Sequence, residues 1–267
     1  MAEDFSTKEP LLWVDQPKPG IVRICMNRPE SFNALSSEMM AALHHQLEQC
    51  RRDASCRVIV LSSKGKAFSA GHDLKEMRSQ PSHDFYEKLF AQCSRLMLSL
   101  QSLPQPVVAQ VDGIATAAGC QLVAMCDLAV ASQSSRFAVS GIHHGLFCAT
   151  PSVGLTRNVP RKWAMEMLLT GDFITADQAL ERGLINRSVT ADALQDVVIE
   201  LCMKIIEKPS VAIEMGKALF YQQSEMGIAA AYQLAGQVMA CNMMDPAAQE
   251  GFQAFLEKRS PDWKTGL

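Results

Sequence analysis

The spacing of hydrophobic positions predicts alternating strands and helices up to about residue 190. Short apolar runs of the kind found in buried strands occur in LLWVDQ, GIVRICMN, RVIVLSS, PVVAQVDG and DLAVAS. Apolar residues recur at helical spacing in SSEMMAALHHQLEQCRRD, HDFYEKLFAQCSRLMLSLQSL and AAGCQLVAMC. Ser36 or Ser37 can cap the first of these helices, and Pro104 follows the end of the second. Crossovers of this length join parallel strands, so we predict an α/β core over residues 1–190.

The last quarter of the chain has a different pattern. From Ala191 to Lys258 the spacing is helical almost throughout, and Pro209 and Pro246 mark helix starts. No internal repeat and no long linker separates this part from the rest. We therefore predict a helical C-terminal region over residues 191–267.

Composition and charge argue against several classes of protein. The chain is 48% apolar and 20% charged, as in ordinary folded proteins. Its formal charge of −3 provides no broad basic field, so we expect no nucleic-acid partner. No run approaches the length that spans a membrane, and MAEDFSTKEP lacks the features of a signal or transit peptide. We predict a cytoplasmic protein, with the mitochondrial matrix as the alternative if a transit peptide has been removed. Nine cysteines without a CxxC pair indicate neither a disulfide framework nor a metal site.

Two glycine-containing junctions are candidates for the functional site. GKAFSAGHDLKEM covers residues 65–77 and VDGIATAAGCQL covers residues 111–122, and each follows a predicted strand. Ala117, Ala118 and Gly119 are small enough for a ligand or another backbone to approach closely. The helix start in the second junction offers unpaired N–H groups, which suit a developing oxyanion. Tight packing of a strand on a helix is the alternative explanation of these small residues.

Four segments in the same order and spacing resemble the enoyl-CoA hydratase/isomerase (crotonase) family over nearly the whole chain. They are FSAGHDLKEM, VDGIATAAGCQLVAMCDLAVAS, LLTGDFITADQALERGLI and EGFQAFLEKR. The resemblance implies a crotonase-like spiral of ββα units, with trimerisation through the helical C-terminal region and a homotrimer or dimer of trimers. It also implies a coenzyme A thioester as substrate, no prosthetic group, and a role in fatty acid metabolism. The backbone N–H groups of His72 and Ala118 match the family's oxyanion hole.

The sequence departs from the family at both glutamates that its hydratases use. Gln121 stands at the first position and Gly141 at the second. An amide cannot take up a proton, and a positioned acid or base contributes roughly 10²–10⁴ in rate, so ordinary hydration should be severely slowed. AAGCQL followed by GLFCATP most resembles the subgroup of enoyl-CoA hydratase domain-containing protein 3, which shows the same two departures.

Other residues, some of them close to Gly141 in the sequence, are candidate proton carriers. His143 and His144 titrate in the useful range, although a histidine pair on a loop is also a common surface or packing feature. The ring of His72 is a secondary candidate. Cys148 can lie in the acyl pocket, but without a visible basic partner it is interpreted as an inert thiol. Asp73 is expected to fasten its loop through local hydrogen bonds.

The resemblance also assigns residues to coenzyme binding. Arg28 and Lys75 match positions that meet the pantetheine and phosphates, and Ser69 and Ala70 match positions at the adenine. Phe255 and Lys258 match positions that reach a neighbouring subunit's ligand. The alternatives are a solvated helix face for the two lysines and a turn-holding role for Arg28. The apolar residues Phe85, Leu89 and Phe90 are expected to be core with some lining of the acyl tunnel.

The leading hypothesis is an acyl-CoA lyase or isomerase that stabilises a thioester enolate in an oxyanion hole. A non-catalytic acyl-CoA-binding or regulatory protein is the alternative from another class. A decarboxylase of the crotonase type is a third possibility, since SAGHD also occurs in such enzymes. RNA binding, found in one branch of the family, is disfavoured because the chain has no basic helix.

Overall fold

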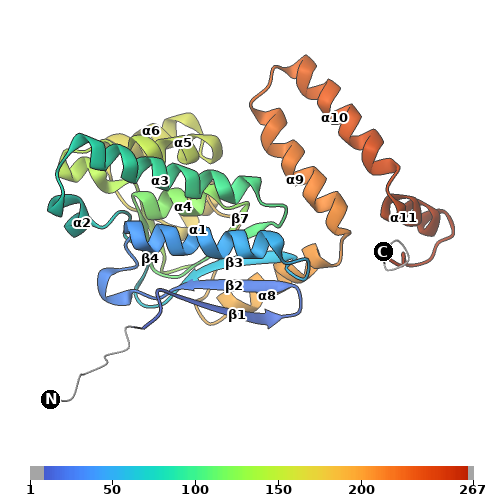
Figure 1. The fold of residues 1–267 in the computed structure, drawn as a ribbon, viewed down its shortest axis with the longest axis horizontal. Coiled ribbons are helices and arrows are strands. Elements are labelled where there is room, and N and C mark those ends of the chain that lie inside the picture. The colour runs from blue at the N-terminus through green and yellow to red at the C-terminus, as the bar shows by residue number, and fades with distance from the viewer. Residues whose placement is uncertain (1–8, 264–267) are drawn as a thin grey trace.

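The computed structural model describes residues 9–263 (Figure 1). Residues 1–8, which belong to the segment considered for targeting, lie outside the described part, as do residues 264–267. The first residues of the predicted core (1–190) and the last residues of the predicted helical region (191–267) therefore lie outside the described residues. No helix among residues 9–263 is long and apolar enough to cross a membrane.

The main sheet has six strands in the order β1-β2-β3-β5-β7-β10. β1 and β2 form an antiparallel hairpin with a register shift near its turn, and β2, β3, β5, β7 and β10 run parallel. The five apolar runs in the sequence correspond to the first five strands, which confirms those predictions. The bounds are β1 (Leu12–Lys18), β2 (Ile21–Met26), β3 (Val58–Ser63), β5 (Val107–Val111), β7 (Leu128–Ser132) and β10 (Arg187–Val189).

A second sheet of very short strands lies beside the first. Its order is β4-β6-β8-β9, with β4 (Ala67–Ser69), β6 (Ile114–Thr116), β8 (Arg136–Ala138) and β9 (Ile174–Thr175). β4, β6 and β8 each follow directly on a strand of the main sheet, namely β3, β5 and β7, and each leads toward a helical turn. The chain therefore repeats a strand–strand–helix unit, as expected for the predicted spiral.

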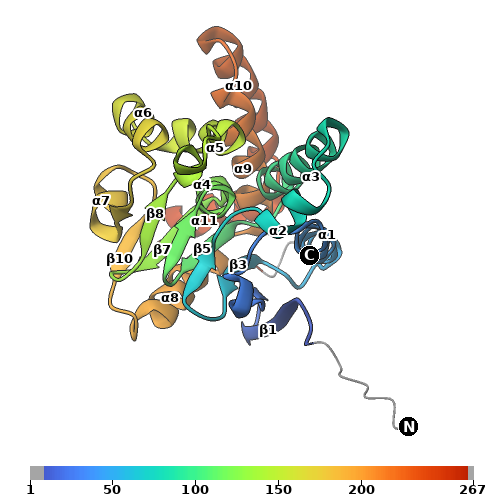
Figure 2. The ribbon, with the colours of Figure 1, turned by 90° about the vertical axis from the view of Figure 1, so that its left-hand side faces the viewer.

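Helices cover both faces of the main sheet (Figures 1 and 2). Alternate strand residues such as Ile24 and Leu61 pack with α1, α3 and α4 on one face, while Val58 and Val108 pack with α8 on the other. The helices of the first 190 residues are α1 (Ser37–Arg52), α2 (Leu74–Ser79), α3 (His83–Ser102), α4 (Ala118–Met125), α5 (Ala149–Asn158), α6 (Arg161–Thr170) and α7 (Ala176–Glu181), with short 3-10 turns η1 (Pro29–Ser31) and η2 (Ser140–His144).

The helix ends follow the sequence signals. The Ser36 hydroxyl, and not that of Ser37, caps α1 by accepting the Met39 amide hydrogen at 3.2 Å. α3 ends at Ser102, two residues before Pro104. Pro209 precedes the first residue of α9, and Pro246 is the first residue of α11.

After β10 the described chain is helical, with α8 (Leu194–Ile206), α9 (Ser210–Ser224), α10 (Ile228–Met243) and α11 (Pro246–Leu256). α8 belongs to the core because Val198 and Cys202 are buried against the sheet. The helices α9, α10 and α11 form an arm that projects from the body in Figure 1. Large apolar side chains of the arm are exposed, including Phe220, Ile228, Tyr232, Met239 and Phe252.

A buried ion pair joins the arm to the core. The Lys217 ammonium of α9 lies 2.6 Å from an Asp127 carboxylate oxygen and also donates to the carbonyls of Leu100 and Gln105. The Tyr221 hydroxyl donates to the other oxygen of Asp127 at 2.8 Å. Since the Lys217 and Asp127 side chains are only 7% and 14% exposed, this pair anchors the first helix of the arm.

Candidate active site

The two glycine-containing junctions meet where β4 and β6 end. A Cβ atom built on Gly71 would lie 2.8 Å from the Ala117 Cβ and 3.1 Å from the Ala118 nitrogen. Gly71 has a φ of +90°, and Ala117 adopts the unusual φ of +50° immediately before α4. Only a residue without a side chain fits at position 71, so the close approach of the two junctions depends on this glycine.

The backbone amides of His72 and Ala118 are left without a partner by this arrangement. Their neighbours are bonded: the Ala117 amide donates to the Ala138 carbonyl, and the Gly71 carbonyl accepts from Leu35. Among residues 9–263, neither the His72 nor the Ala118 amide donates a hydrogen bond. Both residues line the same cavity, and Ala118 is the first residue of α4, where the helix dipole favours negative charge.

The cavity has a volume of about 200 Å³ and a mainly apolar wall. Side chains from α2, α3, η2 and the start of α5 complete it, and its lining includes Ala70, His72, Met77, Phe90, Ala118, Gly141, His144, Leu146, Phe147 and Cys148. A larger open groove of about 1000 Å³ runs between α1, α3 and α9, lined by residues such as Glu48, Arg51 and Arg95. That groove touches neither junction, so the smaller cavity is the candidate active site.

The His72 ring is fixed in one orientation. Its Nδ1 lies 3.3 Å from the Leu35 carbonyl oxygen, which can only accept, so Nδ1 carries the proton. Nε2 is buried and has no hydrogen-bond partner among the described residues. The ring packs edge-on against Phe90 with centroids 5.5 Å apart. Burial lowers the pKa of His72, so the ring is a neutral imidazole at neutral pH.

Position 141, which the sequence resemblance matched with a glutamate, is sealed. A Cβ atom built on Gly141 would lie 2.6 Å from the Leu146 carbonyl oxygen and 2.8 Å from the Cys148 Sγ. The Gly141 amide donates to that sulfur at 3.3 Å. Burial raises the pKa of the Cys148 thiol, and the Gly141 amide opposes part of this effect. A longer side chain at position 141 therefore has no room in this backbone.

The other predicted catalytic residues are dispersed. His144 lines the cavity, but Gln121 and His143 do not. Gln121 is buried, and its Oε1 lies 4.0 Å from the Cys93 Sγ of α3. The His143 ring turns toward the end of α6, where its Nε2 would lie 2.9 Å from a Cβ atom on Gly171. Adjacent residues of a 3-10 turn point in different directions, which separates the two histidines.

The residues predicted to meet the coenzyme are spread over several elements. Arg28 is held beside α1, 3.4 Å from the Ser36 hydroxyl and within 4.0 Å of a Glu38 carboxylate oxygen. Ser69 is buried in β4, where its hydroxyl donates to the Asn33 carbonyl. Ala70 lines the cavity.

Lys75 is an exposed residue of α2, and Asp73 caps that helix by accepting the amide hydrogens of Lys75 and Glu76. The expected loop-fastening role of Asp73 is thus confirmed. Phe255 and Lys258 lie in and just after α11, at the opposite end of the molecule from α2 in Figure 1. Within one chain they do not line the cavity.

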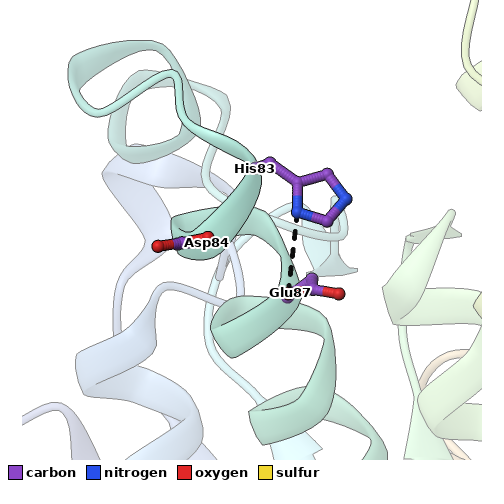
Figure 3. A group of neighbouring side chains, drawn as sticks. All are labelled: His83, Asp84 and Glu87. Carbon is purple, nitrogen blue, oxygen red and sulfur yellow. Dashed lines mark ion pairs between the residues drawn. The ribbon is translucent and has the colours of Figure 1, made fainter.

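One group of possible metal ligands occurs among the described residues, in the first turn of α3 (Figure 3). Its members are His83, Asp84 and Glu87, and all three are exposed. The His83 Nδ1 lies 3.6 Å from a Glu87 carboxylate oxygen, a common pairing across one helical turn. Asp84 turns to the other side in Figure 3. We interpret these three side chains as the solvated first turn of a helix and not as a metal site.

Comparison with known proteins agrees with the geometry. A model of the enoyl-CoA hydratase/isomerase family matches residues 16–266. The chain belongs to this family. It is 44% identical over 252 residues to enoyl-CoA hydratase domain-containing protein 3, mitochondrial, of Xenopus laevis, covering 94% of this chain and 86% of that protein.

Two crystal structures share the fold closely. Enoyl-CoA hydratase from Mycobacterium smegmatis has a TM-score of 0.94 at 59% identity, over 96% of this chain and 99% of that one. Human enoyl-CoA hydratase domain-containing protein 3 has a TM-score of 0.92 at 41% identity, over 95% of this chain and 100% of that one. The predicted fold and the resemblance to this family and subgroup are confirmed.

Proposed function

We propose that this chain binds an acyl-CoA thioester and stabilises its enolate with the backbone amides of His72 and Ala118. The observation that carries the proposal is that two unpartnered amides line one small apolar cavity. Such donors act where charge develops on the thioester oxygen, and removing one typically costs about 10²–10³ in rate. Membership of the family supports the choice of an acyl-CoA ligand.

The coenzyme is proposed to extend from the cavity across the β4 junction. The Ser69 and Ala70 backbone would meet the adenine, and Arg28 and Lys75 would meet the pantetheine and phosphates. Phe255 and Lys258 would contribute to the site of a neighbouring copy in a homotrimer or dimer of trimers. The exposed apolar side chains of the arm support such an assembly, since monomers rarely expose an apolar patch of this kind.

The proton-transfer groups differ from those of the standard hydratases. Gln121 is buried beside Cys93, and position 141 has neither a carboxylate nor room for one. Of the predicted histidines, His144 is the candidate acid or base because it lines the cavity, while the His143 ring would have to turn away from Gly171 to act. We therefore propose lyase or isomerase chemistry in fatty acid metabolism with slow ordinary hydration.

Two alternatives have specific support. The sealed position at Gly141 favours a non-catalytic acyl-CoA-binding or regulatory protein. Decarboxylation is favoured by the combination of the proposed enolate-stabilising pair of amides with a cavity whose lining, among the described residues, includes no carboxylate side chain. Loss of carbon dioxide leaves the enolate directly, so no base is needed to form it.

The test combines binding and turnover. Calorimetry with butyryl-CoA should detect binding, and incubation with crotonyl-CoA should show loss of the conjugated absorbance far below that of an ordinary hydratase. Ala118→Pro removes one donor at the first helical position, where proline is tolerated, and should reduce any turnover by about 10²–10³. Absence of butyryl-CoA binding, or hydratase-level turnover unaffected by Ala118→Pro, would contradict the proposal.

The cellular location stays a prediction. The sequence favours the cytoplasm, whereas the Xenopus laevis relative is named mitochondrial. Microscopy of the tagged chain in its own cell distinguishes them.

A further inference from the structure

A thiol forms part of the wall of the candidate active-site cavity. Cys148 precedes α5, is buried, and lines the cavity together with His72 and Ala118. Its sulfur accepts the Gly141 amide hydrogen at 3.3 Å and lies 2.8 Å from where a Cβ of residue 141 would be. The sulfur therefore occupies the space that a side chain from position 141 would enter.

Cys148 is distinct from the other thiols. All nine cysteines lie among the described residues and are free, and only Cys148 lines this cavity. Cys120 is buried behind it in α4, and the exposed Cys241 is on α10 of the arm. A ligand in the cavity would meet one thiol and two unpartnered backbone amides.

We propose that Cys148 adds covalently to the β-carbon of α,β-unsaturated acyl-CoA thioesters held in this cavity. The inference rests on the proposed function, because the ligand must first bind with its thioester oxygen at the His72 and Ala118 amides. A sulfur–carbon bond forms at the β-carbon, the carbon–carbon π bond breaks, and the thiol proton ends on the α-carbon. The product is a saturated acyl-CoA attached to the protein through a thioether, and no oxidant or further reactant is consumed.

The same amides that stabilise an enolate would assist this step. Addition to the β-carbon moves negative charge onto the thioester oxygen before the α-carbon is protonated, and the amides meet that charge. Burial disfavours the thiolate, so the reaction should be slower than that of an exposed activated cysteine. Confinement of the two reacting groups in one cavity offsets part of this loss. His144 also lines the cavity and is the candidate to carry the proton.

The experiment is intact-mass spectrometry followed by peptide mapping. Wild-type protein is incubated with acryloyl-CoA or crotonyl-CoA, and in parallel with their saturated counterparts, propionyl-CoA and butyryl-CoA. We expect an adduct of one whole enoyl-CoA per chain on Cys148, none with the saturated thioesters, and slower labelling when excess butyryl-CoA is present. Cys148→Ser should abolish the adduct, and Cys241→Ser, which removes an exposed thiol outside the cavity, should keep it.

The controls separate failure of this inference from failure of the proposed function. Circular dichroism and thermal unfolding check that Cys148→Ser is folded, and calorimetry with butyryl-CoA measures binding to the wild type independently of any adduct. Binding of butyryl-CoA without an enoyl adduct on Cys148 would overturn the thiol addition and leave the proposed function standing. Labelling of Cys148 that excess butyryl-CoA does not slow would also overturn it. No binding of any acyl-CoA would overturn both.

Discussion

The Cys148 sulfur lies 3.3 Å from the Gly141 nitrogen and fills the space beside the Gly141 Cα. Position 141, which the sequence resemblance matched with a hydratase glutamate, therefore has no room for a carboxylate side chain in this backbone. The glycine and the position of the thiol are parts of one packing arrangement.

Substitution of Gly141 should therefore destabilise the fold. Gly141→Ala places a methyl group within 2.6–2.8 Å of the Leu146 carbonyl oxygen and the Cys148 sulfur, and should lower the free energy of unfolding by about 1–3 kcal/mol. Gly216→Ala on α9 is the matched control, because a Cβ there meets nothing within 4 Å, and it should raise stability by about 0.5–1 kcal/mol. Denaturant unfolding measures both. Gly141→Glu should likewise gain no hydratase turnover, and a stable, active Gly141→Glu protein would disprove this account.

The His72 ring should make the fold sensitive to acid. Burial lowers the pKa of His72 below its ordinary value of 6.5, so below that pH the unfolded chain takes up a proton that the folded chain does not. The stability that the folded state keeps by holding His72 neutral is fully present above about pH 6.5 and is lost as the pH falls. Unfolding free energies at pH 7.5 and pH 5.5, values chosen to bracket about 6.5, should differ less in His72→Gln than in the wild type.

The Lys217–Asp127 pair should carry much of the attachment of the arm. Lys217→Met leaves the Asp127 carboxylate buried without its cation and should cost about 3–5 kcal/mol in unfolding free energy. Lys204→Met breaks an exposed pair with Glu200 and should cost no more than about 1 kcal/mol. Equal losses of unfolding free energy for the two substitutions would show that the buried pair contributes no more to stability than the exposed pair. Limited proteolysis of the α8–α9 connection gives a second measurement of arm attachment.

The arm should mediate self-association. Tyr232 is 76% exposed on α10, beside the exposed Phe220 of α9, and a charge there opposes burial in an interface. Tyr232→Glu should shift the mass measured by light scattering from the trimer or hexamer to the monomer. Val14→Glu changes an exposed apolar residue of β1 outside the arm and should leave the mass unaltered. A wild-type protein that is monomeric at micromolar concentration would contradict the proposed assembly.

Local sequence patterns were sufficient for the main sheet and its helices but not for the interior of the site. The β-branched runs of β3 and β5 and the proline before α9 each carry a local signal. The second sheet escaped prediction because strands of two or three residues are too short to show a period. His72 and Ala118, which come from the two junction motifs, line one cavity.

Side-chain directions inside the site depend on contacts between distant segments. Nothing near Gln121 in the sequence indicates that its amide would lie beside Cys93 of α3. The approach of Cys148 to Gly141 depends on how the chain folds back after η2, and adjacent His143 and His144 diverge because of the same turn. Interpreting Cys148 as inert followed from the absence of a basic neighbour in sequence, and the structure adds its place in the cavity wall.

The chain passes from the main sheet to the small sheet three times, at β3–β4, β5–β6 and β7–β8, and the first two passages deliver the His72 and Ala118 amides. A peptide N–H is present whatever residue occupies the position, proline excepted. If these amides stabilise the enolate as proposed, descendants of such a scaffold can exchange the side chains that choose a reaction, one substitution at a time, and still inherit the two amides intact.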